Sequence, residues 1–360
     1  VEALCEANGQ DVADLDYLLE NVAIATVADV MDLTEENRIL VKQGLEMLKR
    51  TSNLGLRALI QCIGLEGKKI QAYHIGFILA PCLNASGKLD TAKRALALLR
   101  AKTEREADML AGDLKALNES RRDMTDRVVD EAMAKVEQTD IRGDKVLVIY
   151  LPDCHESLAG LVAGRVRENY YRPVFVLTDS EDGVKGSGRS IESYSMYEEL
   201  TGCGDLLTKF GGHPMAAGLS IDKENVEKFK RRLNDQCTLS EEELTEKVVI
   251  DMELPFTAIT EHFIEELEYL EPFGKGNTKP VFAARGVFMQ HVKIIGKNKN
   301  VAKATAIDAA GNRMEAICFH DAQEFAKQCE RNNGKMSITF YPGINEFRGC
   351  LLYTSPSPRD

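Results

Sequence analysis

The stretch that decides the fold covers residues 144–178 and reads DKVLVIYLPDCHESLAGLVAGRVRENYYRPVFVLT. Apolar runs of strand length open and close it, and residues 155–169 between them carry apolar side chains at helical spacing. A strand, a helix and a second strand in this order are typical of an α/β sheet covered by helices. We therefore predict an α/β domain here.

The segments that follow continue this alternation. We expect a loop leading into a strand at 183–191, a helix at 197–210, the segment GGHPMAAGLSI at 211–221, and a helix at 223–237. Helices of this length between strands predict a mixed or parallel sheet, and the α/β domain then extends over residues 143–240.

The pattern changes from about residue 248. Short strand-like segments recur at regular spacing, with one helical segment at 259–270; they read VVIDMEL, PVFAARGVFMQHVKII, VAKATAID, MEAICF and MSITFYP. Many short strands separated by turns are typical of a small barrel or sandwich. We predict a β-barrel domain over residues 246–349.

Upstream of the α/β domain, the apolar run VAIATV at 22–27 has the length of a buried strand. We expect it to form a strand, followed by a helix at 35–50 and a loop at 80–90. Residues 1–89 would then be the end of another α/β domain. No proline interrupts residues 90–142, and their apolar spacing predicts a long connecting helix from 90 to about 138.

Composition limits the possible functions. The net charge of −12 argues against nonspecific nucleic-acid binding by the chain as a whole, although it does not exclude a local basic groove. No run of about 18 apolar residues occurs, so no membrane span is expected. The nine cysteines are scattered and form no Cys-x-x-Cys pair, which favours reduced thiols in a cytoplasmic protein.

The segment GVKGSGRS at 183–190 is a candidate anion site. Ser187 and Arg189 are two residues apart, so in a strand both side chains face the same way and can converge on one anion. Glycines allow backbone N–H groups to approach that anion closely. A plain hairpin turn explains the same pattern equally well.

The segment FGGHP at 210–214 repeats this pattern. Gly211 and Gly212 free the backbone, and His213 can donate a hydrogen bond, although a single loop histidine is more often structural. His155 stands at the start of the predicted helix, where the helix dipole favours anions. A capping role for His155 is equally compatible with the sequence.

Asp29 is the one candidate metal ligand. An acid at the end of a predicted strand lies where open α/β sheets place their chemistry. Hard divalent ions need several oxygen ligands, however, and no Asp-x-Asp or His-His pair accompanies it upstream. A capping or turn aspartate is the alternative interpretation.

Seven motifs follow one another along the chain: ATVADV, P.LNA.GKL, GLVAGR, RPVFVL, GSGRSI, FGGHPMAAG and LEPFGKGN. In this order they resemble the RecJ-type exonucleases of the DHH phosphoesterase family, and the resemblance covers the chain from about residue 15 to 349. The resemblance implies a DHH α/β domain, a long connecting helix, a DHH-associated domain and an OB fold. It also implies a 5′-to-3′ exonuclease that degrades single-stranded DNA in repair and recombination.

The resemblance assigns roles to individual residues. Asp29 would be the last metal-binding acid, a manganese or magnesium ligand. Ser187 and Arg189 would hold the 5′ phosphate of DNA, and Gly211, Gly212 and His213 would form the phosphate-contacting loop. Asn84 and Lys88 fall in a stretch near the DNA path that reads Arg-Ile-Asn-Ala-Ala-Gly-Arg in the family; Cys82 replaces its first arginine.

Both ends of the chain raise expectations of their own. The early acids and the Asp-His-His triplet of the family do not occur here, so we expect a truncated reading frame that is inactive alone. Residues 350–360 break the preceding strand pattern, and back-translated they resemble a transposon-based sequencing adapter. We expect these eleven residues to be read-through rather than native sequence.

In the complete protein, the resemblance implies metal-assisted phosphodiester hydrolysis with two divalent ions. Single-stranded DNA with a 5′ end would be the substrate, with a single-strand-binding protein and a helicase as further partners of a monomer. Two alternatives remain: a non-catalytic single-stranded nucleic-acid-binding module, and a phosphoesterase for short oligonucleotides or cyclic dinucleotides. The β-rich region after residue 248 argues against the last.

Overall fold

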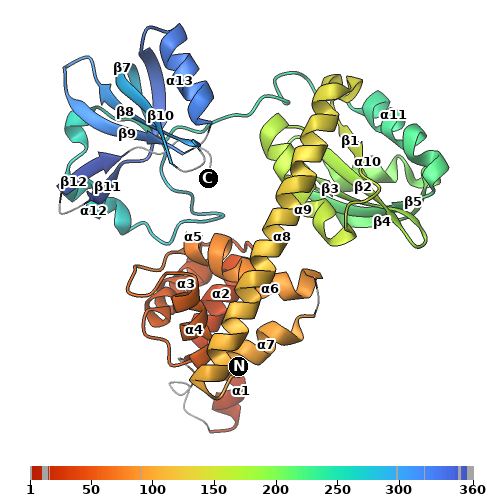
Figure 1. The fold of residues 1–360 in the computed structure, drawn as a ribbon, viewed down its shortest axis with the longest axis horizontal. Coiled ribbons are helices and arrows are strands. Elements are labelled where there is room, and N and C mark those ends of the chain that lie inside the picture. Colours follow the sequence, from red (N-terminus) through yellow and green to blue (C-terminus); the bar gives the residue numbers. More distant parts are fainter. Residues whose placement is uncertain are drawn as a thin grey trace. The chain divides into compact units, whose positions relative to one another are not determined.

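The computed structural model describes residues 2–9, 15, 17–89, 91–296, 299–319, 321–347 and 350–354. The chain divides into two compact units, whose helices and strands are labelled in Figure 1. One comprises residues 51–67 and 78–247, and the other comprises residues 1–50, 68–77 and 248–360. None of the helices within the described ranges is long and apolar enough to span a membrane.

The unit formed by residues 51–67 and 78–247 contains a five-stranded mixed sheet in the order β1-β2-β3-β5-β4. Its strands are β1 (Leu147–Tyr150), β2 (Val174–Ser180), β3 (Gly183–Arg189), β4 (Leu207–His213) and β5 (Ala216–Ile221). β1 and β2 are parallel, and every other neighbouring pair is antiparallel. The predicted mixed sheet is confirmed.

Helices cover both faces of this sheet. The helices of the unit are α4 (Leu54–Cys62), α6 (Ala80–Leu89), α7 (Lys93–Leu99), α8 (Glu104–Gln138), α9 (Glu156–Tyr170), α10 (Met196–Thr201) and α11 (Val226–Gln236). α9 and the end of α8 pack on one face, against alternate residues of β1 and β2. α10 and α11 pack on the opposite face, where Phe175 and Phe229 lie fully buried in edge-to-face contact.

The other unit combines helices with a second sheet. Its helices are α1 (Glu2–Ala7), α2 (Leu19–Ala28), α3 (Glu35–Leu48), α5 (Ala72–His74), α12 (Glu261–Glu268) and α13 (Ala322–Arg331). The guanidinium of Arg38 on α3 donates hydrogen bonds to the carbonyl oxygens of Tyr269 and Leu270. Its Nη2 lies 3.0 Å from each oxygen. These bonds tie the helical part of the unit to the segment that follows α12.

The second sheet has the order β10-β7-β8-β9, and a further two-stranded ribbon pairs β11 with β12. The bounds are β6 (Met252–Glu253), β7 (Phe282–Ile295), β8 (Val301–Ile307), β9 (Arg313–Cys318), β10 (Lys335–Phe340), β11 (Gly343–Phe347) and β12 (Cys350–Thr354). Alternate residues of β8 are buried, as expected for a strand with one face on a core. The predicted β-rich region is confirmed, with the additional helix α13.

The prediction of a strand at residues 22–27 is wrong, because this run belongs to helix α2. Ala23 is fully buried against α3, where a Cβ added to Gly44 would lie 2.5 Å from the Cβ of Ala23. The missing side chain of Gly44 lets the two helix backbones approach closely. A short apolar run is compatible with either a strand or a buried helix, and tertiary packing decides between them.

The predicted loop at residues 80–90 is also wrong, because α6 occupies Ala80–Leu89. Its composition of proline, asparagine, serine and glycine suggested a loop. Ala85 and Ser86 are fully buried, however, and α6 packs along α8. A π-helical segment, Ile75–Leu79, precedes α6 and lies where Pro81 withholds a backbone donor.

Two further boundaries differ from the prediction. The expected helix from residue 90 to 138 is divided into α7 and α8, because the Thr103 side chain caps α8 by accepting from the backbone N–H of Glu106. The expected helix at 197–210 ends at Thr201, and its last residues belong to β4. Gly202 and Gly204 follow the end of α10 and favour this interruption.

Candidate phosphate-binding groove

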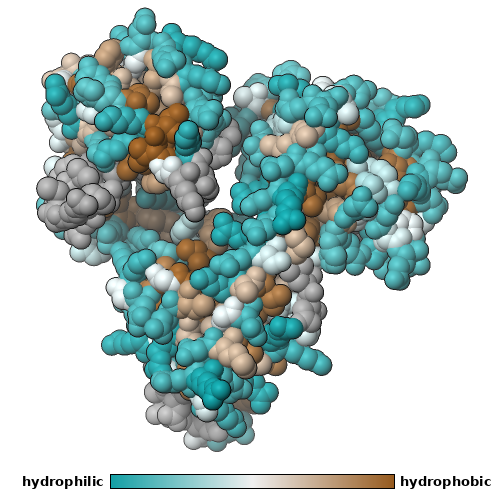
Figure 2. Space-filling view, in the orientation of Figure 1, coloured by the Kyte–Doolittle hydropathy of each residue, from teal (hydrophilic) through white to brown (hydrophobic). Residues whose placement is uncertain are grey.

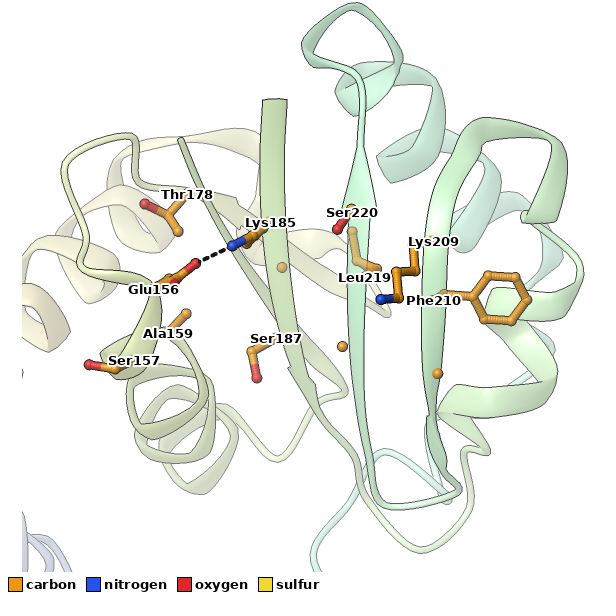
Figure 3. A pocket seen from close by; sticks show the side chains of 13 residues that line it. Glu156, Ser157, Ala159, Thr178, Lys185, Ser187, Lys209, Phe210, Leu219 and Ser220 are labelled. Carbon is orange, nitrogen blue, oxygen red and sulfur yellow. Dashed lines mark hydrogen bonds and ion pairs between the residues drawn. The ribbon is translucent and has the colours of Figure 1, made fainter. Parts of the chain in front are cut away.

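An open groove of about 590 Å³ lies on the α9 side of the mixed sheet (Figure 3). Its floor is formed by β3, β5 and β4, and the first turns of α9 form one wall. α9 covers β2 and part of β3, and the small residues beyond them leave the sheet surface open. The groove therefore exposes sheet backbone and polar side chains to solvent.

The strand registers place the candidate residues on this face in rows. Ser187 of β3 is paired with Gly218 of β5, which is paired with Gly211 of β4. The next row along the same face joins Arg189 and Ala216 to His213. The two glycine-rich segments identified in the sequence thus lie side by side on the groove face.

Ser187 and Arg189 converge as predicted from strand alternation. Arg189 Nη1 lies 3.3 Å from Ser187 Oγ and 2.8 Å from the carbonyl oxygen of Gly188. α9 comes close to both side chains at Gly160, where an added Cβ would lie 2.7 Å from Arg189 Nη2 and 2.9 Å from Ser187 Oγ. A glycine at this position leaves room for the guanidinium and the hydroxyl.

The charge of Arg189 is half-buried and is not neutralised by a neighbouring acid. Burial lowers the pKa of its guanidinium, and the positive charge of Arg167 lowers it further, but arginine remains charged at neutral pH. Among the described residues, no carboxylate lies within ion-pair distance of Arg189. A partly desolvated guanidinium beside a hydroxyl is suited to bind a phosphate oxygen.

The glycines of β3 have a different role from the one predicted. A Cβ on Gly186 would lie 2.4 Å from the Leu177 side chain, and one on Gly188 would lie 2.4 Å from the sulfur of Met196. Both glycines therefore face the core covered by α10 and α11. The expectation that they bring backbone N–H groups to an anion is wrong, because the backbone of β3 is paired with β2 and β5.

The two glycines of β4 differ from each other. A Cβ on Gly211 would meet no atom within 4 Å, so this residue forms open groove floor. Gly212 has a φ of +152°, and a Cβ there would lie 2.4 Å from the carbonyl oxygen of Ala216. His213 is exposed, and its Nδ1 accepts a hydrogen bond from the backbone N–H of Met215 in the hairpin turn.

His155 acts as the N-cap of α9. Its Nδ1 lies 3.3 Å from the backbone nitrogen of Ser157, which donates to it, and 2.8 Å from the Ser157 hydroxyl. The capping alternative is therefore the one the structure displays. An anion-binding role for His155 stays a prediction.

Two lysines of the groove were missed by sequence reasoning. Lys185 and Lys209 are each paired with Ser220 in register, so they form a third row on the groove face. The ammonium of Lys185 lies 2.7 Å from a carboxylate oxygen of Glu156, at the start of α9 (Figure 3). This ion pair lowers the pKa of Glu156. Alternation within each strand was the one sequence signal that could have placed these lysines on the groove face. The register between strands, which brings them into one row, could not be predicted from the sequence.

Asp29 lies in the other unit, at the C-terminal end of α2 rather than at a strand end. Its side chain is exposed, and its backbone N–H donates to the carbonyl oxygen of Ala25. No group of three His, Cys, Asp or Glu side chains suited to hold a metal ion occurs in the ranges that the structure describes. One carboxylate does not fit a two-metal centre, so Asp29 remains a single predicted ligand.

Asn84 and Lys88 belong to helix α6 rather than to a loop. Asn84 is exposed, and the side chain of Lys88 lies outside the described residues. Cys82 is buried, and burial raises the pKa of its thiol. Its sulfur accepts a hydrogen bond from the Asn118 side-chain amide, whose nitrogen lies 3.5 Å away. Cys82 therefore contributes to packing between α6 and α8.

Comparison with known proteins identifies these parts. The family model of the DHHA1 domain matches residues 143–239, and that of the RecJ OB domain matches residues 250–351. The single-stranded-DNA-specific exonuclease RecJ of Bacillus subtilis is 36% identical over 312 residues, which cover 86% of this chain and 39% of that protein. The chain is homologous to RecJ. The Escherichia coli RecJ is 31% identical, covering 94% of this chain and 60% of that protein.

Solved RecJ structures agree with this relationship. A crystal structure of RecJ from Thermus thermophilus in complex with Mn²⁺ matches 99% of this chain and 51% of that chain, with a TM-score of 0.83 and 26% identity. A crystal structure of the same organism's RecJ with Mg²⁺ matches with a TM-score of 0.80 and 25% identity over 54% of that chain. The chain thus spans about 40 to 60% of the length of the RecJ proteins it matches.

Proposed function

We propose that this chain binds the 5′-phosphorylated end of single-stranded DNA, as part of a RecJ-type 5′-to-3′ exonuclease of DNA repair and recombination. The observation that carries the proposal is the half-buried Arg189, which lies 3.3 Å from Ser187 and has no acidic partner within the described ranges. Gly160 leaves space beside both side chains, and Gly211 leaves the floor open. A terminal phosphate supplies the negative charge and acceptor oxygens that this arrangement lacks.

The RecJ OB domain supports binding of the strand that follows. OB folds hold single-stranded nucleic acid through basic side chains and aromatic rings on which bases stack. On β7 the residue Phe288 is 41% exposed, and Lys293 is exposed on the same strand. Lys303 lies opposite Lys293 on β8, where its ammonium is paired with Glu315. We propose that this sheet guides the single strand. A single-strand-binding protein and a helicase stay predicted partners.

Metal-assisted hydrolysis of the strand requires several ligands around each divalent ion. The described residues supply one candidate metal ligand, Asp29, and do not form a centre for manganese or magnesium. We propose that the purified chain binds single strands without degrading them. Release of nucleotides from a 5′-labelled single strand by this chain with manganese would contradict that proposal.

The experiment that tests the binding site compares two oligothymidylates that differ only in a 5′ phosphate or a 5′ hydroxyl. Fluorescence anisotropy is expected to show a preference for the phosphorylated strand. Arg189→Ala is expected to weaken its binding by roughly 10- to 100-fold, the range for a charge-assisted contact. Equal affinity of the wild-type chain for both strands would contradict the proposal.

Arg231→Ala is the matched control. Arg231 is exposed on α11, which covers the sheet face opposite the groove. Its loss changes the net charge by the same amount as the loss of Arg189. We expect it to leave the preference for the 5′ phosphate unchanged. A similar loss in both variants would indicate a nonspecific charge effect rather than a pocket.

A further inference from the structure

The groove contains a second cation, Lys209, which the Ser187 and Arg189 site does not use. Lys209 is exposed on β4 and lines the same groove. No ion pair to its ammonium occurs among the residues that the structure describes. In Figure 3 its side chain is directed from β4 toward β5, over the groove floor.

The strand register fixes the distance between this lysine and the first site. Lys209 is paired with Ser220, one row from Gly211 and Ser187 and two rows from Arg189. Residues on one face of a strand are spaced at about 6.6 Å along it, so the two rows between Lys209 and Arg189 separate them by roughly 13 Å in that direction. This distance is too large for both cations to bind one phosphate at full contact.

Lys185 occupies the same row and provides a contrast. Its ammonium is paired with the Glu156 carboxylate at 2.7 Å, so its charge is neutralised at the groove wall. Between the two lysines and Ser187, the floor carries only Gly218, Gly211 and the small side chain of Ser220. Within the described part of the chain, this row therefore has one neutralised cation and one free cation, with space above the floor for a ligand.

We propose that Lys209 binds a second phosphate of the same ligand, so that the groove recognises a 5′-terminal nucleotide together with the phosphodiester that follows it. This proposal rests on the proposed 5′-phosphate site, which supplies the first anchor. The groove volume of about 590 Å³ exceeds what one phosphate requires. The ligand class is thus a 5′-phosphorylated single strand of at least two nucleotides, read through two phosphates.

The test compares two ligands by isothermal titration calorimetry on the full chain. Thymidine 5′-monophosphate carries one phosphate, and 5′-phosphorylated dithymidylate carries two. Lys209→Ala is expected to weaken binding of the dinucleotide by about tenfold and to lower its salt slope by about one, while binding of the monophosphate hardly changes. Lys209→Arg is expected to retain the dinucleotide affinity. Lys228→Ala on α11, which covers the opposite sheet face, is the control.

The outcomes separate this inference from the proposed function. An unchanged dinucleotide affinity in Lys209→Ala, or an equal loss for both ligands, would overturn the role of Lys209. Arg189→Ala is expected to weaken both ligands, because both carry the 5′ phosphate. If Arg189→Ala weakens neither, the proposed 5′-phosphate site is wrong, whatever Lys209 does. If the wild-type chain binds neither ligand, both proposals fail.

Discussion

The two faces of the mixed sheet use glycine for opposite reasons. On the face covered by α10 and α11, Gly186 and Gly188 leave room for side chains of the core. On the groove face, Gly211 and Gly218 leave a floor that no side chain of the described residues fills. Glycines of β3 thus serve packing on one face of the sheet, and glycines of β4 and β5 serve ligand access on the other. A glycine-rich motif does not by itself reveal which role applies, because the answer depends on the face. The hydropathy of the molecular surface is shown in Figure 2.

The largest effect is expected on the core face. Gly188→Ala would place a methyl group 2.4 Å from the Met196 sulfur and 2.7 Å from the Phe175 ring. Overpacking of this kind lowers the free energy of unfolding by about 1–3 kcal/mol, which urea denaturation measures. Gly211→Ala is the partner on the groove face, and we expect it to change stability by less than about 0.5 kcal/mol. A similar loss of stability in Gly188→Ala and Gly211→Ala would contradict the different roles of glycine on the two faces of the sheet.

A smaller effect is expected at the wall of the groove. Gly160→Ala would place a Cβ 2.7 Å from Arg189 Nη2, and the flexible guanidinium can move aside. We expect affinity for a 5′-phosphorylated strand to fall by about tenfold, as for the loss of one charge-assisted contact. The free energy of unfolding should not fall, because alanine in a helix interior is more favourable than glycine by about 1 kcal/mol.

Gly164→Ala, one turn later on α9, is the matched control. Its added methyl group would meet no atom within 4 Å. We expect the same helix stabilisation with unchanged affinity for the phosphorylated strand, measured by the same anisotropy titration. If Gly164→Ala weakens binding as strongly as Gly160→Ala, the loss of affinity comes from a change in helix α9 itself and not from displacement of the Arg189 side chain.

The sequence alone predicted the α/β domain and the β-rich domain, because apolar segments of strand length recur in both at regular spacing. It failed where tertiary packing decides: residues 22–27 form a helix because Gly44 lets α3 approach them. It also failed for α6, where burial of Ala85 and Ser86 outweighs a loop-like composition. Short apolar runs and loop-like composition are weak evidence when neighbouring elements are unknown.

The candidate site was predictable only within single strands. Alternation along β3 placed Ser187 beside Arg189, and the structure brings them within hydrogen-bond distance. Lys209 and Gly160 were missed because their positions depend on strand register and on the packing of α9. Asp29 shows the converse, since one acid at the end of a helix reveals nothing about the ligands that would complete a metal centre.

A crystal structure of this chain with a 5′-phosphorylated oligothymidylate is the most direct test of the proposed 5′-phosphate site. We expect the 5′ phosphate in the groove, within hydrogen-bond distance of the Ser187 hydroxyl and the Arg189 guanidinium. A bound strand whose 5′ phosphate lies outside the groove, with Arg189 unchanged beside Ser187, would contradict it.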